Sequence, residues 1–233
     1  MNGFKKIGII GAMDEEIDPL IEEELVTEIV ETPVVKFYIN DRFVVARCGI
    51  GKVNAASCTQ AMIDNFGVDV IINTGIAGAI GEGITIGDIV VATDLLEHDF
   101  DATGVGLDKG VIPRMETSVF RCDESLVECA RVACGNVLTK ENFHIGRIVS
   151  GDEFVSKSER KAYLKNTFNA LAAEMEGAAI AHVCYLNKTP FLVIRAMSDN
   201  ASENANDEYE ANDLASIDKT SQVLLEMVGS LVY

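Results

Sequence analysis

The sequence has no apolar run long enough to cross a membrane, which argues against an integral membrane protein. It also shows no cleavage-site pattern after residues 1–6, which lead directly into an apolar segment typical of a strand. Hydrophobic residues make up 48% of the chain, the usual share for a globular protein, so a largely disordered chain is not expected. We therefore expect a cytoplasmic protein without a signal peptide and without a membrane partner.

Basic side chains are scarce, and metal-ligand spacings are absent. The chain has 19 Lys and Arg against 37 Asp and Glu, and the formal net charge of −18 would repel a nucleic acid. The six cysteines form no CxxC pair, and most lie in apolar surroundings such as "VVARCGI" and "IAHVCYL". We therefore expect buried free thiols, no metal site, no cofactor and no nucleic-acid partner.

Linkers, internal repeats and low-complexity tracts are absent too, and short apolar runs alternate with amphipathic ones. Val- and Ile-rich runs predict strands over residues 6–12, 34–40, 42–48, 68–75, 87–94, 143–151 and 191–198. Helical spacing predicts helices over residues 52–66, 123–134, 158–166, 175–186 and 211–229. The second and third strands are expected to form an antiparallel hairpin. The alternation predicts one α/β domain, residues 1–233, with a central mixed, mostly parallel sheet flanked by helices.

Polar and acidic side chains follow several of the predicted strands. Ligands of parallel α/β sheets bind beyond the carboxyl ends of strands, so these positions are the first candidates for a site. The residues at these ends are Met13, Asp14, Glu15, Glu16, Gly75, Gly78, Ser150, Asp152, Phe154, Val155, Glu174, Met175, Glu176, Arg195, Ser198 and Asp199.

The charged members of this set also have structural interpretations. Glu16 would be favoured in a first helical turn by the helix dipole, and Asp199 could simply end a strand. Glu174 and Glu176 lie between Ala-rich stretches, which indicates burial and not a solvated edge. Arg195 would be costly to bury without a carboxylate partner, and Asp199 is a candidate for that partner.

Carboxylates around a pocket favour a ligand that is neutral or becomes positive during a reaction. Hydrolysis of a nucleoside is such a reaction, because the ribose gains oxocarbenium character as its bond to the base lengthens. One carboxylate must take a proton from water, a second must accept hydrogen bonds from the ribose hydroxyls, and a protonated third must donate to the leaving base. A phosphorylase would need several cations to hold phosphate. Because Arg195 is the one cation at a strand end, the charges favour water.

A series of segments points to a known family. In order along the chain they are "IGIIGAMDEEI", "CGIGKVNAA", "VIINTGIAG", "GDIVVATD", "IVSGDEFV", "AAEMEGAAIAHVC" and "VIRAMSDNA". From about residue 5 to the C-terminus they resemble the bacterial 5′-methylthioadenosine/S-adenosylhomocysteine nucleosidases of the nucleoside phosphorylase superfamily. The resemblance implies a nucleoside phosphorylase-like fold and a homodimer. It also implies hydrolysis of the N-glycosidic bond of these two nucleosides, with release of adenine and the 5-thioribose product.

The resemblance implies three catalytic residues. Glu16 matches the acid that activates the attacking water, and Arg195 matches the residue that orients the carboxylate and the water. Asp199, with Ser198 beside it, matches the general acid that protonates nitrogen 7 of adenine. Many members carry a hydroxyl residue where this chain has Ile76, so water placement is left to Glu16, Arg195 and the side chain of Thr74.

It also implies a set of substrate-binding residues. They are Met13, Gly78, Phe154, Val155, Glu174, Met175, Glu176, Ser198 and Tyr209. Glu176 would bind the ribose 2′- and 3′-hydroxyls, next to Met175, which packs against the sugar. Phe154 would stack on adenine, the backbone of Val155 would read the base edge, and Tyr209 would form a lid over the 5′-alkylthio group.

Residues 98–113 correspond to the loop that reaches into the partner subunit's pocket in dimers of the family. Members often place aromatic residues there, whereas this chain has Ala102 and Val105, with Pro113 at the end of the segment. The resemblance therefore implies a roomier 5′ pocket. The acidic segment 199–213 contains no Lys or Arg, and we expect it to begin as a mobile, solvated stretch before the last helix.

Other functions stay open at this point. The chain could be a phosphorylase, or a hydrolase of another purine nucleoside such as futalosine or AMP, although an acidic pocket would repel the 5′-phosphate of AMP. It could also be a catalytically silent nucleoside-binding protein. The set Glu16, Glu176 and Asp199 argues against that, because a binder needs no proton donor to the leaving group.

Overall fold

A mixed sheet of 11 strands forms the centre of the computed structural model, which describes residues 4–22, 28–33 and 35–231. The strands are β1 (Ile7–Gly11), β2 (Glu28–Glu31), β3 (Lys36–Ile39), β4 (Phe43–Arg47), β5 (Val70–Asn73), β6 (Ile76–Ala79), β7 (Ile89–Glu97), β8 (Phe120–Arg121), β9 (Phe143–Ser150), β10 (Ala172–Glu174) and β11 (Phe191–Asp199). The helices are α1 (Asp14–Glu22), α2 (Lys52–Phe66), α3 (Glu124–Val137), α4 (Ser158–Phe168), α5 (Gly177–Asn187) and α6 (Ala205–Leu231), with the short 3-10 helix η1 (Thr103–Val105). The predicted α/β class is confirmed, while the outer limits of the domain, residues 1 and 233, lie outside the described residues.

The long strand β11 joins the two halves of the sheet. Its first residues pair in parallel with β5, and its last residues pair in parallel with β6. Arg195 lies between these two pairings, at the level where β5 has ended and β6 begins. Because β11 also pairs with β7, the strands β11, β6, β10, β9 and β7 close on themselves, whereas β5, β1, β4, β3 and β2 continue as an open sheet.

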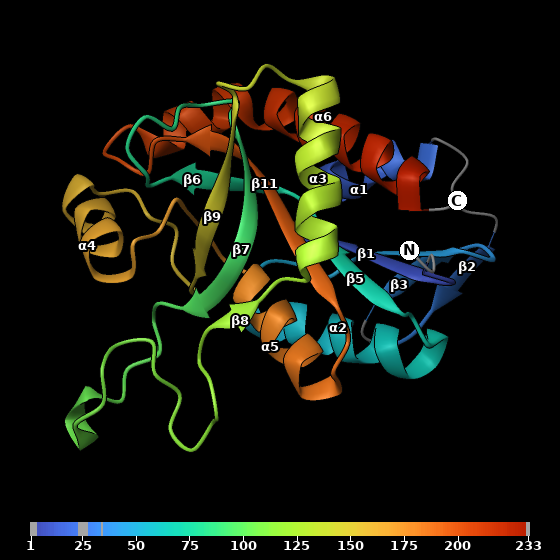
Figure 1. Ribbon diagram of the computed structural model, residues 1–233, viewed down its shortest axis with the longest axis horizontal. Helices are drawn as coiled ribbons and strands as arrows, with labels where there is room; N and C mark the ends of the chain where they lie inside the picture. Colours follow the sequence, from blue (N-terminus) through green and yellow to red (C-terminus); the bar gives the residue numbers. More distant parts are fainter. Residues whose placement is uncertain (1–3, 23–27, 34, 232–233) are drawn as a thin grey trace.

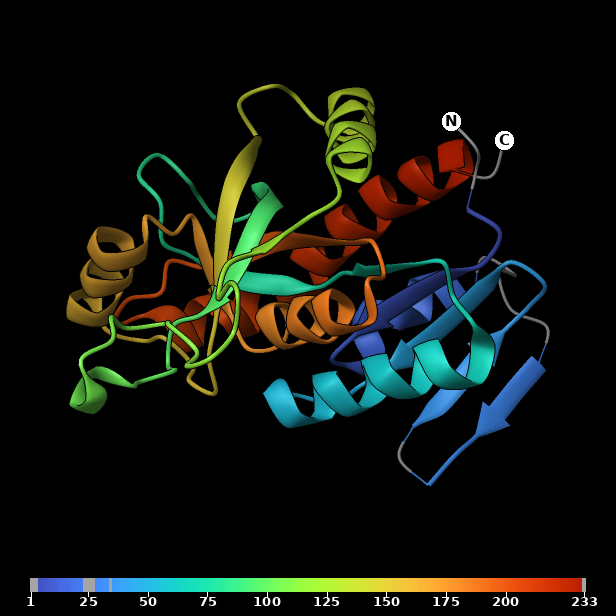
Figure 2. The ribbon, with the colours of Figure 1, turned by 60° about the horizontal axis from the view of Figure 1, so that its bottom comes forward.

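Helices cover both faces of this sheet. The helices α3 and α6 pack together on one side, and α2 and α5 lie side by side on the other (Figures 1 and 2). The segment that follows β7 and contains η1 extends away from the body of the molecule in both views. None of the helices in the described ranges is long and apolar enough to pass through a lipid bilayer.

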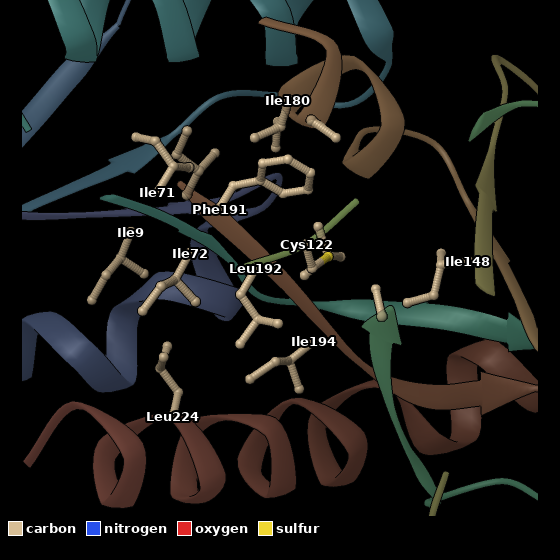
Figure 3. Close-up of a cluster of buried hydrophobic side chains, with 14 of the residues drawn as sticks. Ile9, Ile71, Ile72, Cys122, Ile148, Ile180, Phe191, Leu192, Ile194 and Leu224 are labelled. Atoms are coloured by element: carbon tan, nitrogen blue, oxygen red, sulfur yellow. The ribbon is translucent and has the colours of Figure 1, made fainter. Parts of the chain in front are cut away.

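The core packs β11 between the two helix layers. Leu192 and Ile194 lie on the face toward α6, where Leu224 approaches them, and Phe191 lies on the opposite face near Ile180 of α5 (Figure 3). All five side chains are buried. A strand covered on both faces has no solvated side, which is why residues 191–194 at the start of β11 are continuously apolar.

Most predicted elements are confirmed, including the β3–β4 hairpin for residues 35–47 (residue 34 lies outside the described part) and helix α2, which spans the predicted residues 52–66. The strands β2, β6, β8 and β10 were not predicted, because each is only two to four residues long.

The last helix begins earlier than predicted, so much of the stretch over residues 199–213 is helical, although many of its side chains are exposed as expected. Strand β11 continues to Asp199, and α6 begins at Ala205, six residues before the predicted start at residue 211. The acidic composition is itself the reason: Asp207 and Glu208 lie in the first turn of α6, where the helix dipole favours negative charge. The carboxylate of Glu208 also accepts a hydrogen bond from the N–H of Asn200, 2.8 Å away, which ties the start of α6 to the end of β11.

Candidate active site

A cavity of about 380 Å³ opens where β1 and β10 end and along the last residues of β11. It is lined by Ala12, Met13, Glu16, Ile50, Ile76, Ala77, Gly78, Glu153, Phe154, Val155, Ala173, Glu174, Met175, Glu176, Ser198, Asp199, Asn206 and Tyr209. Five of these residues are Asp or Glu, and none of these lining residues is Lys or Arg. Within the described ranges, no group of three or more His, Cys, Asp or Glu side chains is arranged to hold a metal ion.

Glu16 is folded back over the start of its own helix, α1. Its Oε2 accepts hydrogen bonds from the N–H groups of Ala12 at 2.6 Å and Met13 at 3.1 Å, and its Oε1 accepts one from the N–H of Ile76 at 3.1 Å. The interpretation as a first-turn acid is therefore correct, because this geometry closes the helix start as in a capping box. Burial raises the pKa of Glu16 above its usual value, although the Arg195 guanidinium and the backbone donors oppose the shift. The same carboxylate thus caps a helix and lines the cavity.

Arg195 lies directly beneath the cavity and is 1% exposed. Its Nη2 donates to Glu174 and, at 2.7 Å, to Oδ1 of Asn73, while Nη1 lies 3.9 Å from Oε1 of Glu16. Burial of a guanidinium costs several kcal/mol unless carboxylates and hydrogen bonds compensate it, and these residues supply both. The candidate pairing of Arg195 with Asp199 is wrong, because Asp199 instead bonds to residues near it in the chain.

Glu174 and Glu176 both contact this guanidinium but differ in how they are held. The Oε2 of Glu174 accepts the N–H groups of Glu176 at 3.0 Å and of the first residue of α5 at 2.7 Å, and its Oε1 accepts the hydroxyl of Ser150. The Oε1 of Glu176 accepts the N–H of Gly51 at 2.9 Å, and its Oε2 lies 3.4 Å from Arg195 Nη2. Burial and the neighbouring charge of Glu174 raise the pKa of Glu176 to about 7 in spite of Arg195. Glu176 is therefore the carboxylate of this pair that protein donors leave more open to a ligand.

Asp199, the last residue of β11, faces the same cavity. Its Oδ2 accepts the hydroxyl of Ser198 at 2.9 Å, and its Oδ1 accepts the N–H of Ala201 at 2.8 Å. Burial raises the pKa of Asp199, so the carboxyl retains a proton to higher pH than an exposed Asp. Gly78 passes next to it: a Cβ at this position would lie 3.0 Å from Oδ1 of Asp199.

Two aromatic side chains, those of Phe154 and Tyr209, contribute to the apolar part of the wall. Phe154 belongs to residues 151–157, which connect β9 to α4 and which we call the clamp loop. Its ring is 46% exposed and meets the ring of Tyr209 edge-on, with centroids 6.1 Å apart. The hydroxyl of Tyr209 lies 3.4 Å from Sδ of Met13, so α6, the end of β1 and the clamp loop meet at the cavity.

The structure brings most of the predicted site residues to one cavity. Glu16, Asp199 and all nine predicted substrate-binding residues line it, and Arg195 lies beneath it. Ala102, Val105 and Pro113 do not line it.

The segment with these three residues extends away from the body of the molecule, and Val105 is 77% exposed. A loop that serves a second subunit would require this placement, and their assignment to a partner's pocket stays a prediction. Thr74 is buried outside the lining, and its carbonyl accepts from Arg195 Nη1 at 3.3 Å.

Several contributors to the site were missed. Ile50, Glu153 and Asn206 line the cavity without having been singled out. Gly51 lies in "GIGK", a weak match to a phosphate-binding loop, and its N–H in fact holds a carboxylate. Gly75 was among the strand-end candidates, but its steric role was not predicted: it has a φ of +148°, and a Cβ there would overlap Glu16 Oε1 and Arg195 Nη1. In both cases the signal in the sequence was a glycine at a strand end or helix start.

Known proteins resemble this chain over nearly its full length. The sequence profile of the phosphorylase superfamily matches residues 6–232. A 5′-methylthioadenosine/S-adenosylhomocysteine nucleosidase of Staphylococcus carnosus is 41% identical over 97% of this chain and 100% of its own length.

Two solved structures are also close. The 5′-methylthioadenosine/S-adenosylhomocysteine nucleosidase of Neisseria meningitidis, in complex with methylthio-immucillin-A, superposes with a TM-score of 0.91 and 36% identity, over 97% of this chain and 99% of that one. The futalosine hydrolase of Helicobacter pylori superposes with the same TM-score and identity, over 97% of this chain and 98% of its own.

Gly75→Ala tests the packing of the charged cluster. The new methyl group must displace Glu16 or Arg195, and separating a buried ion pair costs about 3–5 kcal/mol. We expect Gly75→Ala to lower the free energy of unfolding in urea by about that amount. Gly83→Ala is the matched control, because Gly83 also has a positive φ of +76° but no atom lies within 4 Å of its added Cβ. Equal losses in the two variants would contradict the steric argument.

Glu176→Gln tests the raised pKa of Glu176. Between the usual pKa near 4.5 and the folded value of about 7, the folded chain holds a proton that the unfolded chain has released. The unfolded state then binds fewer protons, so the free energy of unfolding falls as the pH rises through this window. We expect this fall to be smaller in Glu176→Gln by on the order of 2–3 kcal/mol, measured by urea unfolding at pH 4.5 to 8. Parallel profiles for the two proteins would exclude Glu176 as the group responsible.

Proposed function

The chain belongs to the phosphorylase superfamily and, within it, to the 5′-methylthioadenosine/S-adenosylhomocysteine nucleosidases, which are N-glycosyl hydrolases, and we propose that it releases adenine from both nucleosides. The observation that carries the proposal is one cavity faced by Glu16, Glu176 and Asp199 and lined by no Lys or Arg. Hydrolysis of a nucleoside offers carboxyl groups three different roles. The three side chains differ in their surroundings in a way that suits those roles.

Glu16 is the proposed base that takes a proton from water. Its pKa is raised by burial, which makes it a better proton acceptor than an exposed carboxylate, and Arg195 stabilises its charged form. The backbone donors at Ala12 and Ile76 fix its orientation, so a water at the cavity side of the carboxylate would be aimed at the sugar. The side chain of Ile76 offers no hydroxyl to this water, which leaves its placement to Glu16.

Glu176 is the proposed acceptor for the ribose hydroxyls, since two adjacent hydroxyls match the two oxygens of one carboxylate. As the bond to the base lengthens, positive charge develops on the sugar between Glu16 and Glu176. The cluster carries three carboxylates against one guanidinium and therefore favours the transition state over the neutral substrate. Glu174 neutralises Arg195 and positions it, because its own oxygens are already occupied by protein donors.

Asp199 is the proposed acid that gives a proton to adenine. Its raised pKa keeps the carboxyl protonated to higher pH, and the hydroxyl of Ser198 orients it. Phe154 offers a ring on which a purine can stack, and the backbone of Val155 lies beside it to contact the base edge. A proton on the purine makes it a better leaving group. General acids of this kind raise reaction rates by about a hundred- to ten-thousand-fold.

Water is favoured over phosphate as the second substrate. An anionic nucleophile needs cations at its binding site, and the lining offers carboxylates instead. The similarity to a futalosine hydrolase keeps a second purine nucleoside as a candidate substrate. We also infer a homodimer in which the segment with Ala102, Val105 and Pro113 completes the 5′ end of the partner's pocket, because these residues lie away from the cavity of their own chain.

Adenine release in phosphate-free buffer tests the reaction type. We expect release from 5′-methylthioadenosine and S-adenosylhomocysteine that phosphate does not accelerate, and loss of about a hundred- to ten-thousand-fold in kcat in Glu16→Gln. Glu15→Gln is the matched control, because Glu15 is the exposed neighbour in the same helical turn and does not line the cavity. Inosine and futalosine in the same assay decide between purine bases.

Phosphate-dependent release would show that the enzyme is a phosphorylase. Unchanged turnover by Glu16→Gln, with normal inhibitor binding, would place the base elsewhere.

Asp199→Asn tests proton donation to the leaving group. We expect a loss of about a hundred- to ten-thousand-fold in kcat with adenine as the leaving group. A 5-methylthioriboside of 4-nitrophenol should lose far less, because nitrophenolate leaves without a proton. Equal losses for the two substrates, measured side by side, would rule out this role for Asp199.

A further inference from the structure

The first turn of α2 is where the two halves of the proposed nucleoside site meet. The N–H of Gly51 donates to Glu176 at 2.9 Å, and the N–H of Lys52 donates to Oδ1 of Asp152 at 2.9 Å. Glu176 is the proposed ribose acceptor, and Asp152 lies in the clamp loop two residues before Phe154, the proposed stacking ring. Two consecutive backbone donors therefore hold the ribose side and the purine side of the cavity.

The side chain of Lys52 closes this arrangement into a ring of contacts. Its ammonium is 18% exposed and lies 2.6 Å from Oδ1 of Asp99 and 3.1 Å from Oε2 of Glu97. The other oxygen of Asp99 accepts the N–H of Asp152 at 3.0 Å. Lys52 thus binds Asp99, Asp99 binds Asp152, and Asp152 binds the backbone of Lys52. Burial lowers the pKa of Lys52, but the hydrogen bonds to Asp99 and Glu97 outweigh it and hold the pKa above its usual value.

The ammonium of Lys52 holds the carboxylates of Glu97 and Asp99, whereas the carboxylate of Asp152 contacts the backbone N–H of the same residue. Without the ammonium, Asp99 would lose its compensating cation in a largely buried site, and Glu97 would keep only His182, whose Nδ1 lies 3.0 Å from its Oε1. The residue after Asp152 is held separately, because Glu153 forms an ion pair with Arg160 of α4 at 2.7 Å. The clamp loop is therefore attached to α2 through Asp152 and to α4 through Glu153. Because Phe154 is the next residue, these two contacts determine the position of its half-exposed ring.

We propose that Lys52 is a positioning residue that locks the clamp loop to the first turn of α2 and so fixes the purine-stacking ring relative to the ribose acceptor Glu176. The inference rests on the proposed function, because it treats Phe154 and Glu176 as the two half-sites for one nucleoside. A nucleoside contacts both half-sites at once, whereas free adenine contacts the purine half alone. A fixed spacing between the half-sites therefore strengthens nucleoside binding more than adenine binding.

Lys52→Met tests the coupling of the two half-sites. The dissociation constants of adenine and of a non-cleavable C-nucleoside analogue of 5′-methylthioadenosine are measured by calorimetry on the full chain. We expect the analogue to bind about ten- to a hundredfold more weakly in Lys52→Met and adenine to change less than about threefold, because misplaced groups lose the advantage of joint binding. The kcat/KM for 5′-methylthioadenosine should fall at least as much as the affinity for the analogue.

Three further variants distinguish a positioning role of Lys52 from a nonspecific loss of structure or stability. Lys219→Met removes another partly buried lysine, whose Nζ contacts the carbonyl of Gly87 at 3.0 Å and which does not line the cavity; it should change neither constant. Lys52→Arg keeps the charge and should restore part of the analogue affinity. Asp99→Asn leaves Lys52 in place and weakens the same ring, so it provides the measurement if Lys52→Met does not fold.

Equal weakening of both ligands in a folded Lys52→Met protein, or unchanged binding of the analogue, would overturn the positioning role. Without a folded Lys52→Met protein, the same results for Asp99→Asn would overturn it. Failure of the unsubstituted chain to bind either ligand would instead count against the proposed function, so the two ideas are tested separately.

Discussion

The burial of a single guanidinium, that of Arg195, is the constraint on which the rest of the site depends. A charged group in a low-dielectric interior must be surrounded by opposite charge and acceptors, and the chain supplies these from α1, β5, β10 and the start of α5. The gap between the end of β5 and the start of β6 gives the guanidinium its place opposite β11. The three carboxylates that compensate Arg195, those of Glu16, Glu174 and Glu176, also line the cavity.

The three carboxylates around Arg195 carry more negative charge than its guanidinium can neutralise. This excess charge affects both the stability of the folded chain and the proposed reaction. Burial raises the pKa of Glu16 and Glu176, so the free protein holds their charges at a cost. In the proposed reaction, a sugar that becomes positive beside them would relieve that cost in the transition state, and stabilisation of this kind accelerates a reaction. Asp199 lies outside this network of ion pairs; burial and the nearby charge of Glu208 raise its pKa, which suits it to the proposed task of donating a proton.

Backbone N–H groups orient the carboxylates that the charge of Arg195 brings together. The N–H groups of Ala12, Ile76 and Gly51 orient Glu16 and Glu176, and the missing side chain of Gly75 lets Glu16 and Arg195 approach the chain between β5 and β6. Donors of this kind are held by the sheet and the helix starts, so they need no reorganisation when a ligand binds. The elements that surround the site thereby determine the position of each carboxylate.

The sequence by itself determined the alternation of strands and helices, the burial of five of the six cysteines (Cys129 is only partly buried) and the acidic nature of the strand ends, because these depend on local composition and periodicity. The resemblance to a known family then pointed to the residues that line the cavity. Tertiary structure alone decided that Arg195 pairs with Glu174 and not with Asp199, which is nearer in the sequence. It also decided that the short runs at β6 and β10 are strands, and that the backbone N–H of Gly51 in "GIGK" binds Glu176. These outcomes depend on strand register and on contacts between residues far apart in the chain, such as Gly51 and Glu176, and no local pattern specifies such distances.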